Sequence, residues 1–269
     1  MHKSKLLDCI TFFDNNLIFE IRYNVLSEFI DYFVICESKF DHKGNPKKQN
    51  FIYKDYYDKQ KIKYLLVDKP FPKNTNEWEN QAIQREELLK QLNFADPDDY
   101  IFFSDPDEIP RPELLIDFSL KKKYGIFLQS CFNYKFNLFN PFESPWEGTR
   151  VTKKKNLKSI DYMRQKIKIK NLNEPFWKLY KEKSIEIFKN GGWHFNSLLT
   201  AEDISIKLKT FAHTEFSSPI YSDVDVIKDN IKKKRDLFKR DKLYNKIDLD
   251  NSFPEYILRN KKKFKNWIL

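Results

Sequence analysis

Two aspartates one residue apart, Asp105 and Asp107, have the residue type and spacing that best suit chemistry in this 269-residue chain. They directly follow the apolar run 100–104, and Pro106 stiffens the backbone between them. Carboxylates spaced in this way can bind one hard divalent cation, with substrate phosphates completing its coordination. The alternative is an acidic turn that caps a helix beginning near Pro112. The pattern therefore predicts a site for Mg²⁺ or Mn²⁺ at the end of a buried strand.

A histidine after two glycines is the next candidate. His194 follows Gly191, Gly192 and Trp193 at the end of a predicted strand, and glycine lets a backbone approach a ligand closely. A satisfied histidine in the core is the alternative. His213, on the apolar face of a later predicted helix, is expected to be structural.

The cysteines do not suggest a metal or disulfide site. Cys9, Cys36 and Cys131 lie far apart in apolar stretches, and the chain has no Cys-x-x-Cys pair. Their number is odd, which also argues against a disulfide framework. We expect all three to be buried free thiols.

The first half of the chain alternates strand and helix patterns. Short apolar runs predict strands, and apolar residues at three- and four-residue spacing predict helices. The strands are expected at 6–13, 31–38, 62–67 and 100–104, and the helices at 17–29 and 77–92. This alternation predicts an α/β fold, a mostly parallel sheet with helices on both faces. Ligands of such sheets bind at the carboxyl ends of the strands, where Asp105 and Asp107 stand.

The second half is less regular. The aromatic segment 124–139 predicts a long strand or a hairpin, and alternating basic and apolar residues over 150–190 suggest more strand. A helix is expected near 201–211 and a charged amphipathic helix over 223–246. We therefore expect a catalytic domain at 1–220 and a basic helical extension at 221–269, packed on or flanking it.

The net charge of +10 is regional. Residues 151–170 hold eight Lys and Arg against one Asp, and residues 221–269 hold fourteen against eight acidic residues. Such blocks attract nucleic acid, an anionic membrane surface or an acidic substrate, although solvated lysine faces are an equal alternative. No apolar run approaches the ~18–20 residues of a membrane span, and no signal-peptide core is visible. A cytoplasmic protein is expected.

Several stretches of the chain match one enzyme family in the family's order. They are 8–15 with Glu20 and Arg22, 33–38, 77–85, 103–110, 191–195 and 207–215. Together they resemble glycosyltransferase family 17, the family of the β-1,4-mannosyl-glycoprotein β-1,4-N-acetylglucosaminyltransferases. The resemblance implies a GT-A fold, which is Rossmann-like, with a nucleotide-sugar donor, a divalent metal and inversion at the anomeric carbon. UDP-N-acetylglucosamine and Mn²⁺ (or Mg²⁺) are the implied donor and metal.

The resemblance also implies roles for particular residues. A metal that bridges the donor diphosphate would be held by Asp105, Asp107 and His194. The donor would be contacted by residues at the strand ends and on the preceding helix: Thr11, Phe12, Asp14, Glu37, Arg85, Ser104, Asp105 and Trp193. Arg85 suits a diphosphate because its guanidinium can make paired hydrogen bonds. Glu108 would support the metal ligands or contact the sugar.

An inverting transfer needs a carboxylate base for the acceptor hydroxyl. The candidates are Glu202, Asp203 and Glu215, with Glu202 favoured, although Glu202 or Asp203 beside Thr200 could instead start a helix. Trp146, in a predicted turn, is the best candidate for stacking against a sugar ring.

The acceptor implied is a glycan or a lipid-linked saccharide. No membrane anchor or stem like those of the eukaryotic family members is expected, so the resemblance does not extend to their protein-linked acceptor. Basic residues of the tail, Lys232, Lys233 and Lys234, could hold the enzyme at an anionic membrane.

Two other functions remain open. One is a nucleotidyl- or phosphotransferase that uses the same aspartates. The other is a nucleic-acid-binding protein that uses the basic blocks, but no known nucleic-acid-binding module is visible and nucleic acid is not the expected partner.

Overall fold

The computed structural model describes residues 3–210 and 214–269. Its first half is the predicted set of parallel strands, with strand order β4-β1-β2-β3 and the two predicted helices. The elements are β1 (Leu6–Phe12), α1 (Asn16–Leu26), β2 (Tyr32–Ser38), β3 (Ile62–Val67), α2 (Glu77–Lys90) and β4 (Tyr100–Ser104). The α/β prediction is confirmed.

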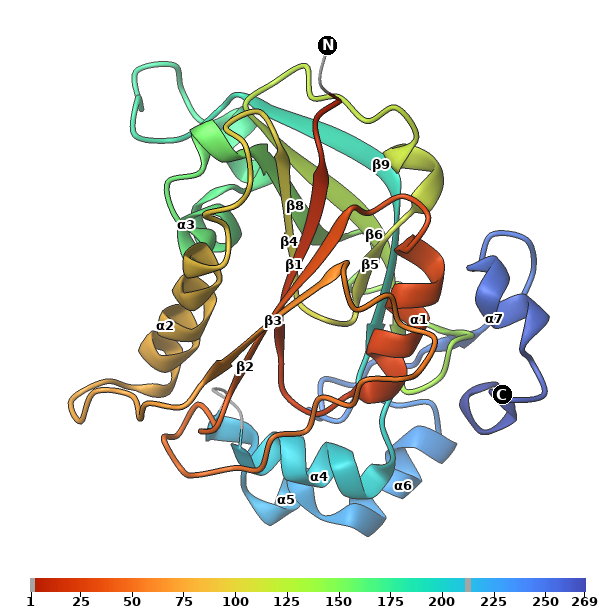
Figure 1. The fold of residues 1–269 in the computed structure, drawn as a ribbon. Coiled ribbons are helices and arrows are strands. Elements are labelled where there is room, and N and C mark those ends of the chain that lie inside the picture. The colour runs from red at the N-terminus through yellow and green to blue at the C-terminus, as the bar shows by residue number, and fades with distance from the viewer. Residues whose placement is uncertain (1–2, 211–213) are drawn as a thin grey trace.

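The sheet has helices on both faces (Figure 1). Alternate strand residues separate the two cores, because successive side chains point to opposite faces. Ile10 and Phe33 pack with α1, whereas Cys9 and Val34 pack with Leu88 of α2. All three cysteines are free and buried, as expected.

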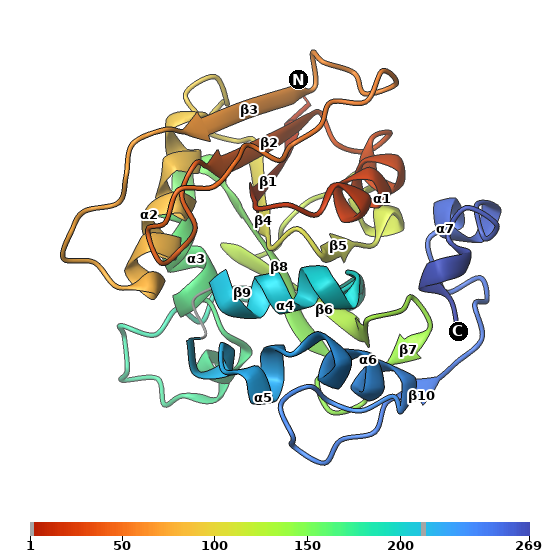
Figure 2. The ribbon, with the colours of Figure 1, turned by 90° about the horizontal axis from the view of Figure 1, so that it is seen from below.

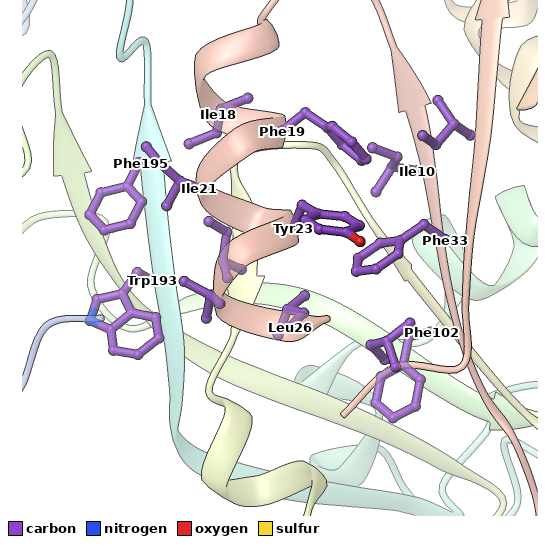
Figure 3. Packing of buried hydrophobic residues seen from close by; sticks show 14 of the residues in the cluster. Ile10, Ile18, Phe19, Ile21, Tyr23, Leu26, Phe33, Phe102, Trp193 and Phe195 are labelled. Atoms are coloured by element: carbon purple, nitrogen blue, oxygen red, sulfur yellow. The ribbon is translucent and has the colours of Figure 1, made fainter. Parts of the chain in front are cut away.

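Helix α1 fills the space between the parallel strands and a later strand. The Asn15 side chain accepts a hydrogen bond from the Ile18 amide and so caps the helix. Figure 3 shows Phe19 and Tyr23 of α1 directed toward Phe33, while Ile21 lies toward Phe195. The helix thus links two parts of the sheet that are distant in sequence.

The second half extends the sheet with mostly antiparallel pairs. Strand β8 (Trp146–Lys153) pairs antiparallel with both β4 and β6 (Tyr124–Asn133), and β6 turns into β7 (Leu138–Phe139), so residues 124–139 form a hairpin. The long strand β9 (Ile185–Asn196) runs parallel to β6 and antiparallel to β5 (Glu108–Pro110). Strand β10 (Asn245–Lys246) pairs with β7 at the edge.

Two predictions for the second half are wrong. Residues 154–184 are not strand: α3 (Ile160–Lys166) forms here, because Ser159 caps it and Ile160 and Met163 bury one face. The expected helix over 223–246 is only α6 (Val224–Lys232), after the short α5 (Pro219–Ser222). The chain then turns back, with Leu237 and Tyr244 buried beside α4 (Ala201–Thr210).

The C-terminal residues pack on the main core. Phe253, Ile257 and Phe264 belong to the same buried cluster as α1, and α7 (Glu255–Arg259) lies against that helix. Short 3-10 helices complete the fold at Pro112–Leu115, Lys154–Asn156, Ile169–Asn173, Thr214–Phe216 and Lys265–Trp267. None of the helices in the described parts of the chain is long and apolar enough to cross a membrane.

Helix α4 lies beyond the carboxyl ends of the parallel strands. Figures 1 and 2 show it on that side of the sheet, with α5 and α6 beside it. The space between the strand ends and α4 is where the polar residues gather.

Candidate active site

A cavity of about 890 Å³ opens between the carboxyl edge of the sheet and α4. Its walls come from the segments after β1 and β4, from α2, α3 and α4, and from the end of β9. Eight residues predicted from the sequence line it: Thr11, Phe12, Asp14, Arg85, Asp105, Asp107, Trp146 and His194.

Asp105 is held by two arginines. Arg164 Nη2 donates to Asp105 Oδ2 at 2.7 Å, and Arg85 Nη2 lies 3.7 Å from Oδ1. Burial favours the neutral acid, but the charges of Arg164 and Arg85 outweigh it and lower the pKa of Asp105. Asp105 is therefore an ionised carboxylate with cationic partners already in place.

Glu108 lies behind the cavity wall and binds the residues that hold Asp105. Its side chain is fully buried and accepts hydrogen bonds from Arg164 Nη2 at 2.6 Å and from Trp146 Nε1 at 2.6 Å. Its Oε2 also accepts from the Asp105 amide at 3.1 Å. Glu108 thus orients both the arginine and the indole that line the cavity.

Arg164 is a site residue that the sequence analysis missed. It was counted only as part of the basic block 151–170. The available signal was its spacing of four residues from the apolar Ile160, which brings Arg164 to the buried side of α3.

Asp107 and His194 face each other across the strand pair β5–β9. In this pair Glu108 lies opposite His194, and the Phe195 amide donates to the Asp107 carbonyl at 2.9 Å. His194 Nε2 is 3.6 Å from Asp107 Oδ1. The β6–β9 register brings Cys131 beside His194, with 3.7 Å between Sγ and Nδ1.

These contacts shift both pKa values. Burial acts against the charge of Asp107, but His194 more than compensates and lowers the Asp107 pKa to about 2. Burial likewise disfavours protonated His194, whereas Cys131 and Asp107 raise its pKa well above the ordinary value. The pair is an ion pair near neutral pH.

The cavity residues supply some, but not all, of the ligands that a divalent metal would need. Within residues 3–210 and 214–269, no group of three His, Cys, Asp or Glu side chains is arranged to hold an ion. Once His194 gives up its proton, Asp107 and His194 would offer one carboxylate and one neutral imidazole side by side, a donor set that suits Mn²⁺. Since Asp105 is engaged by arginines, a bound ion would need further ligands from a substrate.

The remaining wall carries other carboxylates. Glu143 lies 3.1 Å from Arg240, and both line the cavity. Glu147 accepts from Arg150 and from the Ile169 amide, each at 3.3 Å. The Trp146 ring lies 4.9 Å from the His194 ring, so the indole has one flank against the site, as its predicted stacking role requires.

Three residues predicted to contact the donor do not line the cavity. Glu37 is buried and binds Lys47, two backbone amides and the Tyr64 hydroxyl. Ser104 is buried against Thr149 at 2.7 Å. Trp193 points to the opposite face of β9 from His194, into the core beside α1 (Figure 3), because strand residues alternate. All three are structural in their contacts.

The carboxylates predicted as the base also lie outside the cavity wall. Glu202 is exposed and pairs with Lys228 at 2.7 Å. Asp203 and Thr200 cap α4 through reciprocal hydrogen bonds, which is the helix-start alternative considered above. Glu215 is exposed in the 3-10 helix after α4. His213 lies outside the described residues.

Comparison with known proteins gives one family match. A model of glycosyltransferase family 17 matches residues 1–141, which include β1 to β6 and both motif aspartates. No curated protein sequence matches the chain.

Solved structures with a similar arrangement are remote. One is a glycosyltransferase involved in glycosylation of the major capsid of PBCV-1, with 11% identity and a TM-score of 0.35, covering 69% of this chain and 82% of that one. HddC from Yersinia pseudotuberculosis, complexed with GMP-PN, has 9% identity and a TM-score of 0.35, with coverage of 69% and 90%. The inositol-1-phosphate CTP transferase from T. maritima has 12% identity and a TM-score of 0.36, with coverage of 73% and 91%.

Proposed function

Because the chain belongs to glycosyltransferase family 17, we propose that this glycosyltransferase moves N-acetylglucosamine from UDP-N-acetylglucosamine to a glycan or lipid-linked saccharide, with inversion. The observation that carries the proposal is the cluster of Asp105, Asp107, Arg164 and His194 in one cavity at the strand ends. Its cations can balance a diphosphate, and its carboxylates can share a metal with that diphosphate.

The donor would lie along the ends of β1 and β4. Thr11, Phe12 and Asp14 would contact the nucleoside, and Arg85 the diphosphate. Arg85 Nε is buried without a hydrogen-bond partner among the described residues, so an anion there would satisfy it. This unpaired donor supports a role for Arg85 in holding negative charge.

Asp107 and His194 would hold the metal, Mn²⁺ or Mg²⁺. A bound ion would neutralise the charge that develops on the leaving nucleotide. Arg164 would keep Asp105 ionised beside it, and Glu108 would keep Arg164 and Trp146 in position.

We assign the base to Glu143 in place of Glu202. Three carboxylates of the wall remain after Asp105 and Asp107: Asp14, Glu143 and Glu147. Asp14 belongs to the donor end, and Glu147 is engaged by Arg150 and a backbone amide. Glu143 also pairs with an arginine, Arg240 at 3.1 Å, but that side chain is 40% exposed, whereas Arg150 beside Glu147 is 1% exposed. Glu143 is therefore the less firmly held carboxylate of the two, and we assign it to accept the proton of the acceptor hydroxyl.

The test is thermal stabilisation by nucleotide sugars with and without Mn²⁺. Ligands that bind the native state raise the melting temperature by mass action. We expect UDP-N-acetylglucosamine with Mn²⁺ to stabilise the enzyme, and Asp107→Ala to abolish the effect. Asp98→Asn, which changes an exposed aspartate that is not part of the cavity wall, is the matched control and should respond normally. Stabilisation by nucleoside triphosphates alone would favour the nucleotidyltransferase alternative.

The base is tested by comparing Glu143→Gln with Glu202→Gln. Glu143→Gln should lower kcat by at least about 100-fold while donor stabilisation is retained, because only proton removal is lost. Glu202→Gln should remain active. Loss of activity in Glu202→Gln but not in Glu143→Gln would instead identify Glu202 of α4 as the base.

A further inference from the structure

Residues 174–183, here called the aromatic loop, carry large apolar side chains into solvent. The exposed fractions are 81% for Phe176, 67% for Trp177, 89% for Leu179 and 74% for Tyr180. Phe176 and Trp177 contact each other at 5.3 Å rather than the core. A contiguous exposed cluster of this kind on a folded protein marks an interaction surface.

The aromatic loop is held in shape by its own hydrogen bonds. The Lys178 amide donates to the Pro175 carbonyl at 3.1 Å, and the Lys181 amide donates to the Lys178 carbonyl at 3.0 Å. Lys178 Nζ binds Glu174 at 2.7 Å. Figure 1 shows the loop as the projecting teal segment at the upper left, just before β9. The aromatic side chains are therefore presented on a formed turn.

Positive charge surrounds these aromatic residues. Residues 166–183 contain six lysines and two glutamates. Lys166 and Lys170 are exposed at the base of the loop, and Lys181 Nζ lies 5.1 Å from the Tyr180 ring centre. At an anionic bilayer surface, aromatic side chains can enter the boundary between headgroups and acyl chains, and adjoining lysines can contact the charged headgroups.

We propose that the aromatic loop docks this enzyme on an anionic lipid bilayer. Phe176, Trp177 and Leu179 would enter the headgroup region, and the neighbouring lysines would contact lipid phosphates. Charge complementarity favours lipid over a second copy of this basic chain, whose own lysines would be repelled.

The aromatic loop suits this role better than the tail lysines named from the sequence. Lys233, at the C-cap of α6, pairs with Asp229 at 2.7 Å, and Asp223 and Asp225 begin the helix. Residues 223–235 hold five Lys and Arg against three Asp, a net charge of +2, compared with +4 for residues 166–183. The aromatic loop follows α3, which carries Arg164, and Lys168 between them lines the cavity. Docking through the loop would hold the active site close to the bilayer.

Vesicle co-sedimentation tests the proposal with the full chain and no donor, so that its outcome is independent of the proposed reaction. The probes are phosphatidylcholine vesicles with and without about one third phosphatidylglycerol. We expect binding to the anionic vesicles, weakened by high salt, and at least tenfold weaker binding for Phe176→Ser/Trp177→Ser.

Two controls keep the result interpretable. Phe142→Ser removes another exposed aromatic residue beside a lysine, and Lys232→Glu/Lys233→Glu alters the tail; both should bind as the native enzyme does. An unchanged melting temperature shows that the loop variant is folded. Failure to bind anionic vesicles, or full binding by the folded loop variant, would overturn the proposal. So would self-association in the absence of lipid that the loop variant abolishes.

Discussion

The charges of the candidate site are matched residue by residue. Arg164 bridges Asp105 and the fully buried Glu108, while His194 faces Asp107. A buried ion pair adds little stability by itself, but removing one partner leaves a charge without solvent or counterion. The site is consequently most sensitive to losing a single member.

Arg164→Met should show this sensitivity. It leaves Glu108 buried without its cation, so we expect the free energy of unfolding to fall by about 3–5 kcal/mol, measured by denaturant titration. Arg259→Met, which removes an exposed arginine 2.5 Å from Glu255, should change it by less than about 1 kcal/mol. Equal effects of the two substitutions would mean that the Arg164 network is not a buried one.

The two histidines of the cavity should give opposite pH dependences. The pKa of His194 is raised, so its contribution to stability is present below its ordinary pKa of about 6.5 and is lost as pH rises through the raised value. His42 also lines the cavity, where its Nε2 lies 3.1 Å from Gln84 Oε1. Burial lowers the pKa of His42, so stability is lost as pH falls from about 6.5 toward the lowered value.

Melting temperatures in EDTA across pH measure these contributions. His194→Gln should be most destabilised relative to the native enzyme at mildly acidic pH. His42→Gln should lose less stability than the native enzyme as the solution is acidified. The same slope for both variants would contradict the assignment.

At the scale of elements, the site depends on how β5 meets β9. Gly192 has a φ of +131°, and a Cβ there would lie 2.1 Å from the Ile109 carbonyl oxygen. This close approach sets the β5–β9 register, which brings His194 opposite Glu108 and near Asp107. A glycine is required because both the dihedral angle and the space exclude a side chain.

Gly192→Ala should destabilise the enzyme and shift His194 away from Asp107. Gly44→Ala is the matched control, since Gly44 also has a positive φ, +87°, but has open space around it. We expect Gly192→Ala to lose more stability than Gly44→Ala by at least about 1 kcal/mol, because steric overlap adds to backbone strain. Similar losses of stability in the two variants would show that β5 and β9 can move apart to accommodate a side chain at residue 192.

The elements also explain what the sequence could predict. Strands β1 to β4 are short apolar runs, and Asp105 and Asp107 share the turn that follows β4. The local sequence pattern was therefore sufficient to predict these strands and to place the two aspartates at a strand end. The strand prediction for residues 150–190 was wrong at α3, because its many arginines and lysines gave no indication of a buried helix face. Glu37 and Trp193 were named from their place near strand ends, but alternation decides which face a side chain joins. Helical spacing could have indicated the buried side of Arg164 but not its partners, and Glu143 reaches the cavity through long-range packing that no local pattern contains.

At the scale of the whole molecule, the C-terminal residues share the core of the rest. Phe264 packs against Phe136 at 5.5 Å, and Tyr256 donates to Glu20 of α1 at 2.7 Å. These contacts join C-terminal residues to the core that contains α1. We expect both parts to unfold together.

Phe264→Ala tests this integration. A cavity in a shared core should lower the free energy of unfolding by about 3–5 kcal/mol and leave one calorimetric transition. Leu243→Ala, at a position 57% exposed, should have little effect. Two transitions, with only the smaller one shifted by Phe264→Ala, would indicate a separate domain.

Residues 154–184, which carry both Arg164 and the aromatic loop, connect β8 to β9. The chain leaves the sheet and returns to it beside the same residue of β6. Thr152 of β8 and Ile185 of β9 are both in register with Tyr124 of β6, so the two ends stand two strand spacings apart, about 10 Å. With its ends pinned, the stretch can lengthen at little entropic penalty, about 0.6 kcal/mol for each doubling. The aromatic loop lies within this stretch but beyond Arg164, so it can be exchanged without rebuilding the sheet and without removing the arginine that binds Asp105 and Glu108. Such an exchange would direct the same catalytic scaffold to another surface.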